Sequence, residues 1–339
     1  MRTQFILLAA VLGVAPMLCA QHAAKPPIAI KATAKGEIPA GPAITDSAMC
    51  DDAGNVYSRP FGPNSVSEYL RAPIVEITAE AKPVGSFPSE GHTFFVRGDR
   101  VYALAGPPPS LSVVEFAQDR SVKSRTKLQL DFFVQVSLLG VFKSGEYLVV
   151  GLAGTITETA PHLRTPFTAV FAADGRLVKK VYDPEDEDAR QKAEGSDPKY
   201  FRCCSDSGNE FVGWNADVAA GSDGYVYLMH GTSPPLIYVI SPAGDVVRKF
   251  QVNVGNPELT TNSIKFHEGR LAIGFGWVGD LPESLIKVID LKGNSIADYE
   301  IKEGARDSDP ILACYNADGF TLMPRRAGPK PYLLTAKLP

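Results

Sequence analysis

The sequence lacks the short motifs that would identify a common enzyme class directly. It contains no Gly-x-Ser-x-Gly nucleophile elbow and no His-Glu-x-x-His zinc helix. Lys and Arg number 34 against 38 Asp and Glu, a formal net charge of −4, so the clustered basic face that nucleic-acid binding requires is not expected. Beyond the first residues no apolar run reaches the ~18 residues that cross a bilayer. The sequence therefore predicts no nucleic-acid partner and no transmembrane segment after the N-terminal leader.

Cysteine is also scarce, with five residues in the chain. One lies in the N-terminal leader, and the other four, Cys50, Cys203, Cys204 and Cys314, are candidates for disulfides in an oxidising compartment. Four cysteines allow three pairings, and the sequence leaves all three open. The adjacent pair Cys203-Cys204 lacks the two intervening residues of zinc and thioredoxin-type motifs, so no metal site is expected there.

The first 20 residues have the pattern of a secretory signal peptide. Met1-Arg2 supplies a charged start, Phe5–Val14 an apolar core too short to span a bilayer, and Ala20 a small residue before the expected cleavage at Gln21. Lipidation at Cys19 is the alternative, although the residues before it fit that reaction poorly. The leader predicts a secreted or periplasmic protein.

What the chain does have is glycine and proline, 30 and 27 residues, together with 45% hydrophobic residues. Many turns combined with enough apolar residues for a large core are typical of an all-β protein with short strands. All-β propellers and barrels often exceed the usual size of one domain, so residues 21–339 are predicted to form a single domain.

An internal repeat supports this prediction. A short apolar segment, a tight turn with glycine and an alternating apolar segment recur six times. The turn glycines are Gly54, Gly98, Gly145, Gly224, Gly269 and Gly319. Their intervals are 44, 47, 79, 45 and 50 residues, and a propeller blade takes about 40 to 50 residues. A second hairpin follows several copies, which predicts a six-bladed β-propeller with four-stranded antiparallel blades.

Two places depart from the regular repeat. The interval of 79 residues indicates either an insertion at residues 183–215 or a seventh blade. The last copy is followed by only one further strand, at Tyr332–Lys337, so the final blade needs an outermost strand. The alternating segment Ile28–Thr33 is predicted to provide it and to close the ring, which removes an open sheet edge.

The repeat resembles a known superfamily. Residues 220–228, followed by residues 237–244, are similar to repeats of NHL-type six-bladed propellers, and the similarity extends as a repeat pattern over the chain after the leader. The resemblance implies several functions: binding scaffolds, gluconolactonase-like hydrolases and lyases. A shared fold does not choose among them.

One set of polar residues precedes the innermost strands and is predicted to surround the mouth of the central channel. Its members are Asp46, Glu90, Gln135, Asp217, Asn262 and Asp309, together with His92 beside an inner strand. Carboxylate and amide oxygens are ligands that Ca²⁺ and Mg²⁺ prefer. The resemblance to gluconolactonase-like propellers implies such an ion, and the candidate metal ligands are Asp46, Asp217 and Asn262. The alternative is structural, because Asp and Asn also favour loops through hydrogen bonds to the backbone. No catalytic residue and no certain cofactor is assigned.

The insertion at residues 183–215 links two blades on the same face as this channel mouth. Its aromatic residues Tyr200, Phe201, Phe211 and Trp214 predict an ordered lid over part of the channel, for which a disulfide through Cys203 or Cys204 is a candidate anchor. The acidic run at residues 183–188 favours the alternative, a mobile surface loop.

These observations predict an exported propeller that binds an unidentified protein or small molecule on its loop-rich channel face without catalysis. A divalent-metal-dependent hydrolase of the gluconolactonase type is the alternative, and a lyase is a third. Binding predicts no dependence on metal, whereas the hydrolase requires an ion held by the channel-mouth oxygens.

Overall fold

The computed structural model describes residues 26–37, 44–61, 72–88, 91–107, 109–154, 165–181, 217–231, 234–254, 259–277, 284–303, 310–324 and 332–339. These residues form strands and turns, and none of them forms a helix that could cross a membrane. The leader at residues 1–20, the insertion at 183–215 with its proposed lid, and Cys203 and Cys204 lie outside the described residues.

The described strands, in chain order, are β1 (Ile28–Glu37), β2 (Ile44–Cys50), β3 (Val56–Phe61), β4 (Ile74–Ile77), β5 (Pro83–Phe87), β6 (Gly91–Arg97), β7 (Arg100–Ala105), β8 (Ser112–Phe116), β9 (Val122–Lys127), β10 (Phe133–Val141), β11 (Tyr147–Gly154), β12 (Thr165–Phe171), β13 (Leu177–Lys180), β14 (Asp217–Ala220), β15 (Val226–His230), β16 (Leu236–Ile240), β17 (Val246–Gln251), β18 (Leu259–His267), β19 (Arg270–Trp277), β20 (Ser284–Asp290), β21 (Ser295–Glu303), β22 (Pro310–Asn316), β23 (Gly319–Pro324) and β24 (Tyr332–Lys337).

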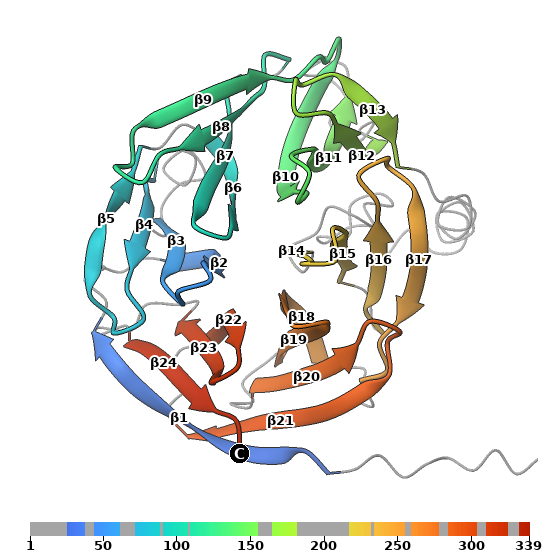
Figure 1. Cartoon of the computed structure of the whole chain (residues 1–339). Helices are drawn as coiled ribbons and strands as arrows, with labels where there is room; N and C mark the ends of the chain where they lie inside the picture. Colours follow the sequence, from blue (N-terminus) through green and yellow to red (C-terminus); the bar gives the residue numbers. More distant parts are fainter. Residues whose placement is uncertain are drawn as a thin grey trace, which may run out of the picture.

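The sheets are arranged around a central axis as a β-propeller (Figure 1). Four antiparallel sheets contain four strands each in chain order, β2–β5, β6–β9, β10–β13 and β14–β17. An eight-stranded sheet has the order β18-β19-β20-β21-β1-β24-β23-β22. The first strand of each meander lies near the axis, and strands such as β9, β13 and β17 run along the perimeter (Figure 1).

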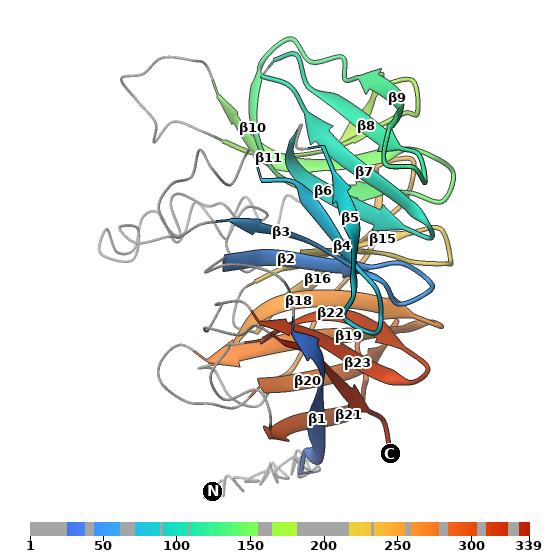
Figure 2. The same ribbon diagram turned by 90° about the vertical axis from the view of Figure 1, so that its left-hand side faces the viewer.

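The strands nearest the axis form the wall of the channel. In the described part of the chain β2, β6, β10, β14, β18 and β22 contact one another in this order, and β22 contacts β2 to complete the cycle. Figure 2 shows the turns after these strands on one side of the disc. We call this side the turn end of the channel and the opposite side, where the inner strands begin, the entry end.

Strand β1 joins the two halves of the eight-stranded sheet. Residues Ala32–Glu37 pair antiparallel with β24, so the predicted pairing of the N-terminal segment with the last strand is confirmed. The pairing begins four residues later than the start of the predicted strand, because Ile28–Lys31 pair in parallel with β21 instead.

Burial follows the radial position of each strand. The third strand β16 is buried at every position, whereas the fourth strand of the same sheet, β17, is buried at none. Successive side chains of a strand point to opposite sheet faces, and in the inner strands both faces lie against neighbouring sheets. The third strand β16 is therefore a continuous apolar run, whereas innermost strands such as β2 and β18 also contain polar residues and the perimeter strands carry many charges.

The predicted turn chemistry is confirmed. All six inner turn glycines have positive φ, from 58° at Gly98 to 135° at Gly319, a region that other residues enter at a cost. Gly175, Gly244 and Gly293 occupy the same position in outer turns. In the first two sheets Ala81 and Arg120 take this position, at φ of 63° and 68°. These two turns lack glycine, which is why their hairpins are weak in the sequence.

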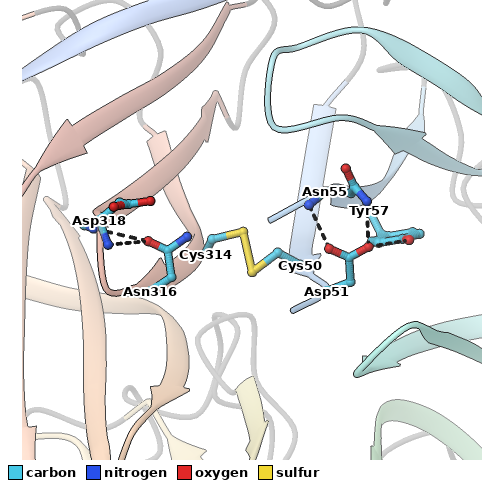
Figure 3. The surroundings of a disulfide bond; sticks show 8 residues. Cys50, Asp51, Asn55, Tyr57, Cys314, Asn316 and Asp318 are labelled. Atoms are coloured by element: carbon cyan, nitrogen blue, oxygen red, sulfur yellow. Dashed lines mark hydrogen bonds between the residues drawn. A yellow bond between two sulfur atoms is a disulfide. The ribbon is translucent and has the colours of Figure 1, made fainter. Parts of the chain in front are cut away.

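A disulfide joins the first and last inner strands. Cys50 at the end of β2 bonds to Cys314 on β22, with Cα atoms 5.4 Å apart and a sequence separation of 264 residues (Figure 3). Of the four candidate cysteines, Cys50 and Cys314 are thereby paired with each other, while Cys203 and Cys204 lie outside the described residues. Nearby, Asp51 accepts hydrogen bonds from the Asn55 amide groups and from the Tyr57 hydroxyl, which fixes the turn that follows Cys50.

Candidate functional site

The channel wall contains a feature that the sequence did not reveal: β-bulges in five of the inner strands. In each, the register with the second strand of the sheet shifts, and one or two residues are left without a cross-strand partner. These residues are Asp46 and Ser47 in β2, His92 in β6, Ser137 in β10, Asn262 in β18 and Ala313 in β22. We call them the bulge positions.

The bulge positions lie at one level of the channel. Each stands six to eight residues before the glycine of the following inner turn. Strand β14 has no bulge, but its first residue, Asp217, stands seven residues before Gly224 and reaches the same level. Ser47, Ser137 and Asn262 are half-buried, although the inner strands around them are mostly buried. Among the bulge positions with described side chains, Ser47, Ser137 and Asn262 are therefore polar and partly exposed, whereas Ala313 is 0% exposed in a core cluster.

This level overlaps the predicted channel-mouth set but is not identical to it. Asp46, His92 and Asn262 are bulge positions, and Asp217 lies at their level. Gln135 instead pairs in register with Leu152, and Ser137 takes the bulge. Glu90 and Asp309 lie outside the described residues, as do the side chains of Asp46, His92 and Gln135.

Sequence reasoning missed Ser137. Its distance from Gly145 is eight residues, the same as from Asp46 to Gly54, so a constant spacing to the turn would have been a better guide than residue type.

Asp217 is buried and links two sheets. Its Oδ2 accepts a hydrogen bond from the backbone N of Ile264 at 2.8 Å and lies 3.1 Å from Nζ of Lys265. Both partners are on β18, an edge strand whose channel side has no ladder partner. A buried carboxylate needs such a counter-charge and donor, because removing it from water is costly. Asp217 therefore holds β14 against β18.

Asn262 makes the equivalent link to the next sheet. Its Nδ2 donates to the carbonyl of Pro310 on β22 at 3.3 Å, and its Oδ1 accepts from the Ser263 hydroxyl at 2.8 Å. A Cβ at Gly274 on β19 would lie 2.5 Å from this Oδ1, so glycine there leaves room for the amide. The structural alternative predicted from the sequence was that Asp and Asn side chains form hydrogen bonds to the backbone. Both Asn262 and Asp217 do so, and in each case the backbone group belongs to a neighbouring sheet.

Two arginines complete the links between sheets. Arg59 on β3 is 1% exposed and donates from Nη1 to the carbonyl of Gly91 at 2.6 Å. Arg97 at the end of β6 donates to the carbonyls of Val141 at 2.8 Å and Gly221 at 3.1 Å, and so connects three sheets at the turn end. Burial lowers the pKa of Arg97 from its usual value, against the opposing effect of nearby acidic groups.

A metal centre is not seen among the described side chains, none of which forms a group of three His, Cys, Asp or Glu suited to an ion. The predicted metal site of Asp46, Asp217 and Asn262 stays a prediction, because the side chain of Asp46 is not among the described side chains. Within the set, Asp217 already has a cation and a backbone donor as partners.

A separate open cleft of about 860 Å³ lies at the perimeter. Residues 125–131 line it together with Asp174 and Leu177, so it lies between the end of β9 and the turn before β13. Its floor includes the buried Leu128. This cleft contains none of the bulge positions.

No family model matches the chain, and no curated protein matches its sequence. The PQQ-bound form of aldose sugar dehydrogenase from Streptomyces coelicolor is 11% identical, covering 92% of this chain and 100% of that chain, with a TM-score of 0.46. Hydrazine synthase of Kuenenia stuttgartiensis is 13% identical, covering 85% and 75%, with a TM-score of 0.46. A protein of unknown function from Bacteroides caccae is 13% identical, covering 77% and 88%, with a TM-score of 0.45. Likeness at this level carries no argument about function.

Proposed function

We propose that this chain is an exported β-propeller of six four-stranded blades, formed as one domain by residues 21–339, that binds a small ligand or a partner at the entry end of its channel without catalysis. The count of six is supported by the closed cycle of inner strands. It treats the eight-stranded sheet as two blades divided between β21 and β1, where the only parallel pairing of that sheet occurs. The NHL-like repeat and the leader support the remaining parts of the proposal.

The observation that carries the binding function is the group of partly exposed polar side chains at three bulge positions, Ser47, Ser137 and Asn262. Bulges are frequent beside functional sites, because they turn a side chain out of the regular ladder. The links made by Asp217, Asn262, Arg59 and Arg97 hold the surrounding wall in one geometry. A wall that already has its binding geometry loses less conformational entropy when a ligand binds, and this favours binding.

The engagement of Asp217 favours binding over the metal-dependent hydrolase. A hydrolase of the gluconolactonase type would use Asp46, Asp217 and Asn262 to hold its ion. The Lys265 ammonium forms an ion pair with Asp217 and would repel a divalent ion at this carboxylate.

Thermal denaturation separates the two functions. The protein is melted in Ca²⁺, in Mg²⁺ and in chelator, and against a panel of sugars, sugar acids, amino acids and nucleotides, and lactone hydrolysis is assayed in parallel. We expect at least one compound class to raise the melting temperature, equal melts with and without chelator, and no hydrolysis. A lower melting temperature in chelator together with lactone turnover would establish the hydrolase instead.

A further inference from the structure

The perimeter cleft lies at a junction between two neighbouring sheets. One side is formed by residues 125–131, at the end of β9 and beyond it, and the other by the turn between β12 and β13. The backbone N of Gln129 donates to the carbonyl of Gly175 at 2.8 Å, and a Cβ at Gly175 would lie 2.0 Å from the carbonyl oxygen of Lys127. The backbone around the cleft is therefore held in place before a ligand binds, which lowers the entropy lost on binding.

The corresponding junctions of three other pairs of sheets are filled by a side chain. In each of them a side chain lies within 3.0 Å of the position that a Cβ would take at the facing glycine: Arg120 at Gly85, Lys179 at Gly244 and Phe250 at Gly293. At Gly175 the closest contact is instead the backbone carbonyl of Lys127. The side chains around this junction leave an open cleft of about 860 Å³. The cleft is thus a departure from the repeated packing between the sheets.

The lining of the cleft combines apolar side chains with charges of both signs. Leu128 is buried, whereas Leu130 and Leu177 are partly exposed. Lys127 and Asp131 are exposed, and neither forms an ion pair with another described residue. A polyanion would be repelled by Asp131 and a polycation by Lys127. A ligand that carries both charges beside an apolar group matches this lining.

The position and shape of the cleft favour an extended chain over a compact small molecule. Pockets for small molecules enclose most of their ligand, whereas this cleft is open at the perimeter. Strand β9 is the edge strand of its sheet, and sheet edges are recurrent sites for extended peptides. A few residues of such a peptide can lie in the cleft while the rest of its chain continues outside.

From these observations we propose that the cleft between β9 and the turn before β13 is a second binding site, separate from the channel. It holds an extended peptide segment of a partner protein. In this segment an apolar side chain lies against Leu130 and Leu177, an acidic residue contacts Lys127, and a basic residue contacts Asp131.

The test is fluorescence polarisation with a library of labelled octapeptides whose ends are capped. Each peptide has a core of leucine or of serine between two flanks, and the flanks are glutamate or lysine in all four combinations. We expect peptides with a leucine core and one flank of each sign to bind best. Replacing the leucine core by serine should weaken binding about tenfold, because the apolar contact is lost.

Charge reversal locates the site. Lys127→Glu and Asp131→Lys change exposed residues of the cleft, and Lys143→Glu and Asp318→Lys are matched controls in exposed inner turns. Each cleft variant should weaken binding of the mixed-charge peptide about three- to tenfold, because an attraction becomes a repulsion. Lys127→Glu should in turn prefer the peptide with two lysine flanks. The controls should bind as wild type does, and all four variants should melt as it does.

The proposal is wrong if no peptide binds, if peptides with leucine and serine cores bind equally, or if both cleft variants bind as tightly as wild type. Tighter binding of heparin or of phosphatidylglycerol vesicles than of any peptide would also contradict it. The altered residues are not bulge positions, so these results are independent of the binding function proposed for the entry end of the channel.

Discussion

At the scale of single residues, two kinds of position determine this structure: turn residues at positive φ and buried polar groups that connect sheets. Glycine at a turn removes the steric cost of positive φ. Some of these glycines also allow a close approach of a second strand. A Cβ at Gly175 would lie 2.0 Å from the carbonyl oxygen of Lys127 on the preceding sheet, whereas a Cβ at Gly224 would meet no atom within 4 Å.

This difference gives a matched pair of substitutions. Gly224→Ala, at φ of 93°, should cost about 1–2 kcal/mol through backbone strain alone. Gly175→Ala, at φ of 85°, should cost about 1–3 kcal/mol more, because the backbone of β9 must move away. Urea denaturation of both variants measures the two costs. Equal midpoints would show that the contact between the outer turn and β9 contributes nothing.

His230 at the end of β15 makes stability depend on pH. Burial lowers the pKa of this imidazole from 6.5 to about 4, so the folded state disfavours its proton. The unfolded chain binds the proton below about pH 6.5 and the folded protein only below about pH 4. Stability from this group is therefore complete above pH 6.5 and is lost as the pH falls toward 4, by up to about 3 kcal/mol.

The measurement is a series of urea denaturations between pH 7 and pH 4 for wild type and His230→Leu. The variant should lose less stability across this interval, since it lacks the His230 imidazole that gains a proton on unfolding. Parallel curves for the two proteins would assign the acid sensitivity to other groups.

At the scale of elements, several features protect the sheet edges at the perimeter from pairing with other chains. Strands β9, β13 and β17 carry the basic residues Lys123, Arg125, Lys127, Lys179, Lys180, Arg248 and Lys249 and no acidic residue. Charged edge strands resist pairing with other chains. Strand β5 begins with a proline, and β21 is covered in part by β1. The long strand β1 thus covers the outer side of β21 and of β24 within the eight-stranded sheet.

Two truncations separate the two pairings of β1. Deletion of the chain through Lys31 removes the parallel pairing with β21 together with the buried Ile30, and should lower the melting temperature moderately. Deletion through Glu37 also removes the antiparallel pairing with β24, together with the buried Ala32, and should destabilise the whole protein much more. Differential scanning calorimetry gives both values. A wild-type melting temperature after the longer deletion would contradict the role of β1 in closing the ring.

At the scale of the whole molecule, the ring is closed twice at the same seam. Strands β1 and β24 pair at the perimeter, and the Cys50–Cys314 disulfide joins β2 to β22 at the channel. Between them lies a core cluster that includes Val56, Ile77, Ile311 and Leu333 from both sides of the seam. Closure therefore combines a strand ladder, a covalent bond and apolar burial.

The disulfide should stabilise the ring by limiting the unfolded chain. A cross-link that closes a loop of 264 residues contributes about 5 kcal/mol in the chain-entropy model. The double variant Cys50→Ser/Cys314→Ser should melt well below the wild type. A reducing agent should lower the wild-type melting temperature toward that of the variant and leave the variant unchanged. If the variant melts at the wild-type temperature, the ladder and the core alone close the ring.

The sequence by itself determined the strands, the inner turns and the pairing of the two ends, because these depend on local chemistry. Glycine at positive φ marks a turn wherever it occurs, as at Gly54 and Gly269, and alternation or continuous apolar runs mark strands. It also located Asp46, Asp217 and Asn262 at the level of the channel wall where the bulges lie.

Only the tertiary structure decided how those elements meet. The partner of Cys50 depended on which strands close the ring, and four cysteines leave that choice open. Ser137 rather than Gln135 takes the bulge because register is set by the paired strand, and a shift of one residue is invisible in the sequence of either strand. The roles of Asp217 and Arg97 likewise arise from unpaired backbone groups on neighbouring sheets, which exist only once the inner strands stand side by side around the channel.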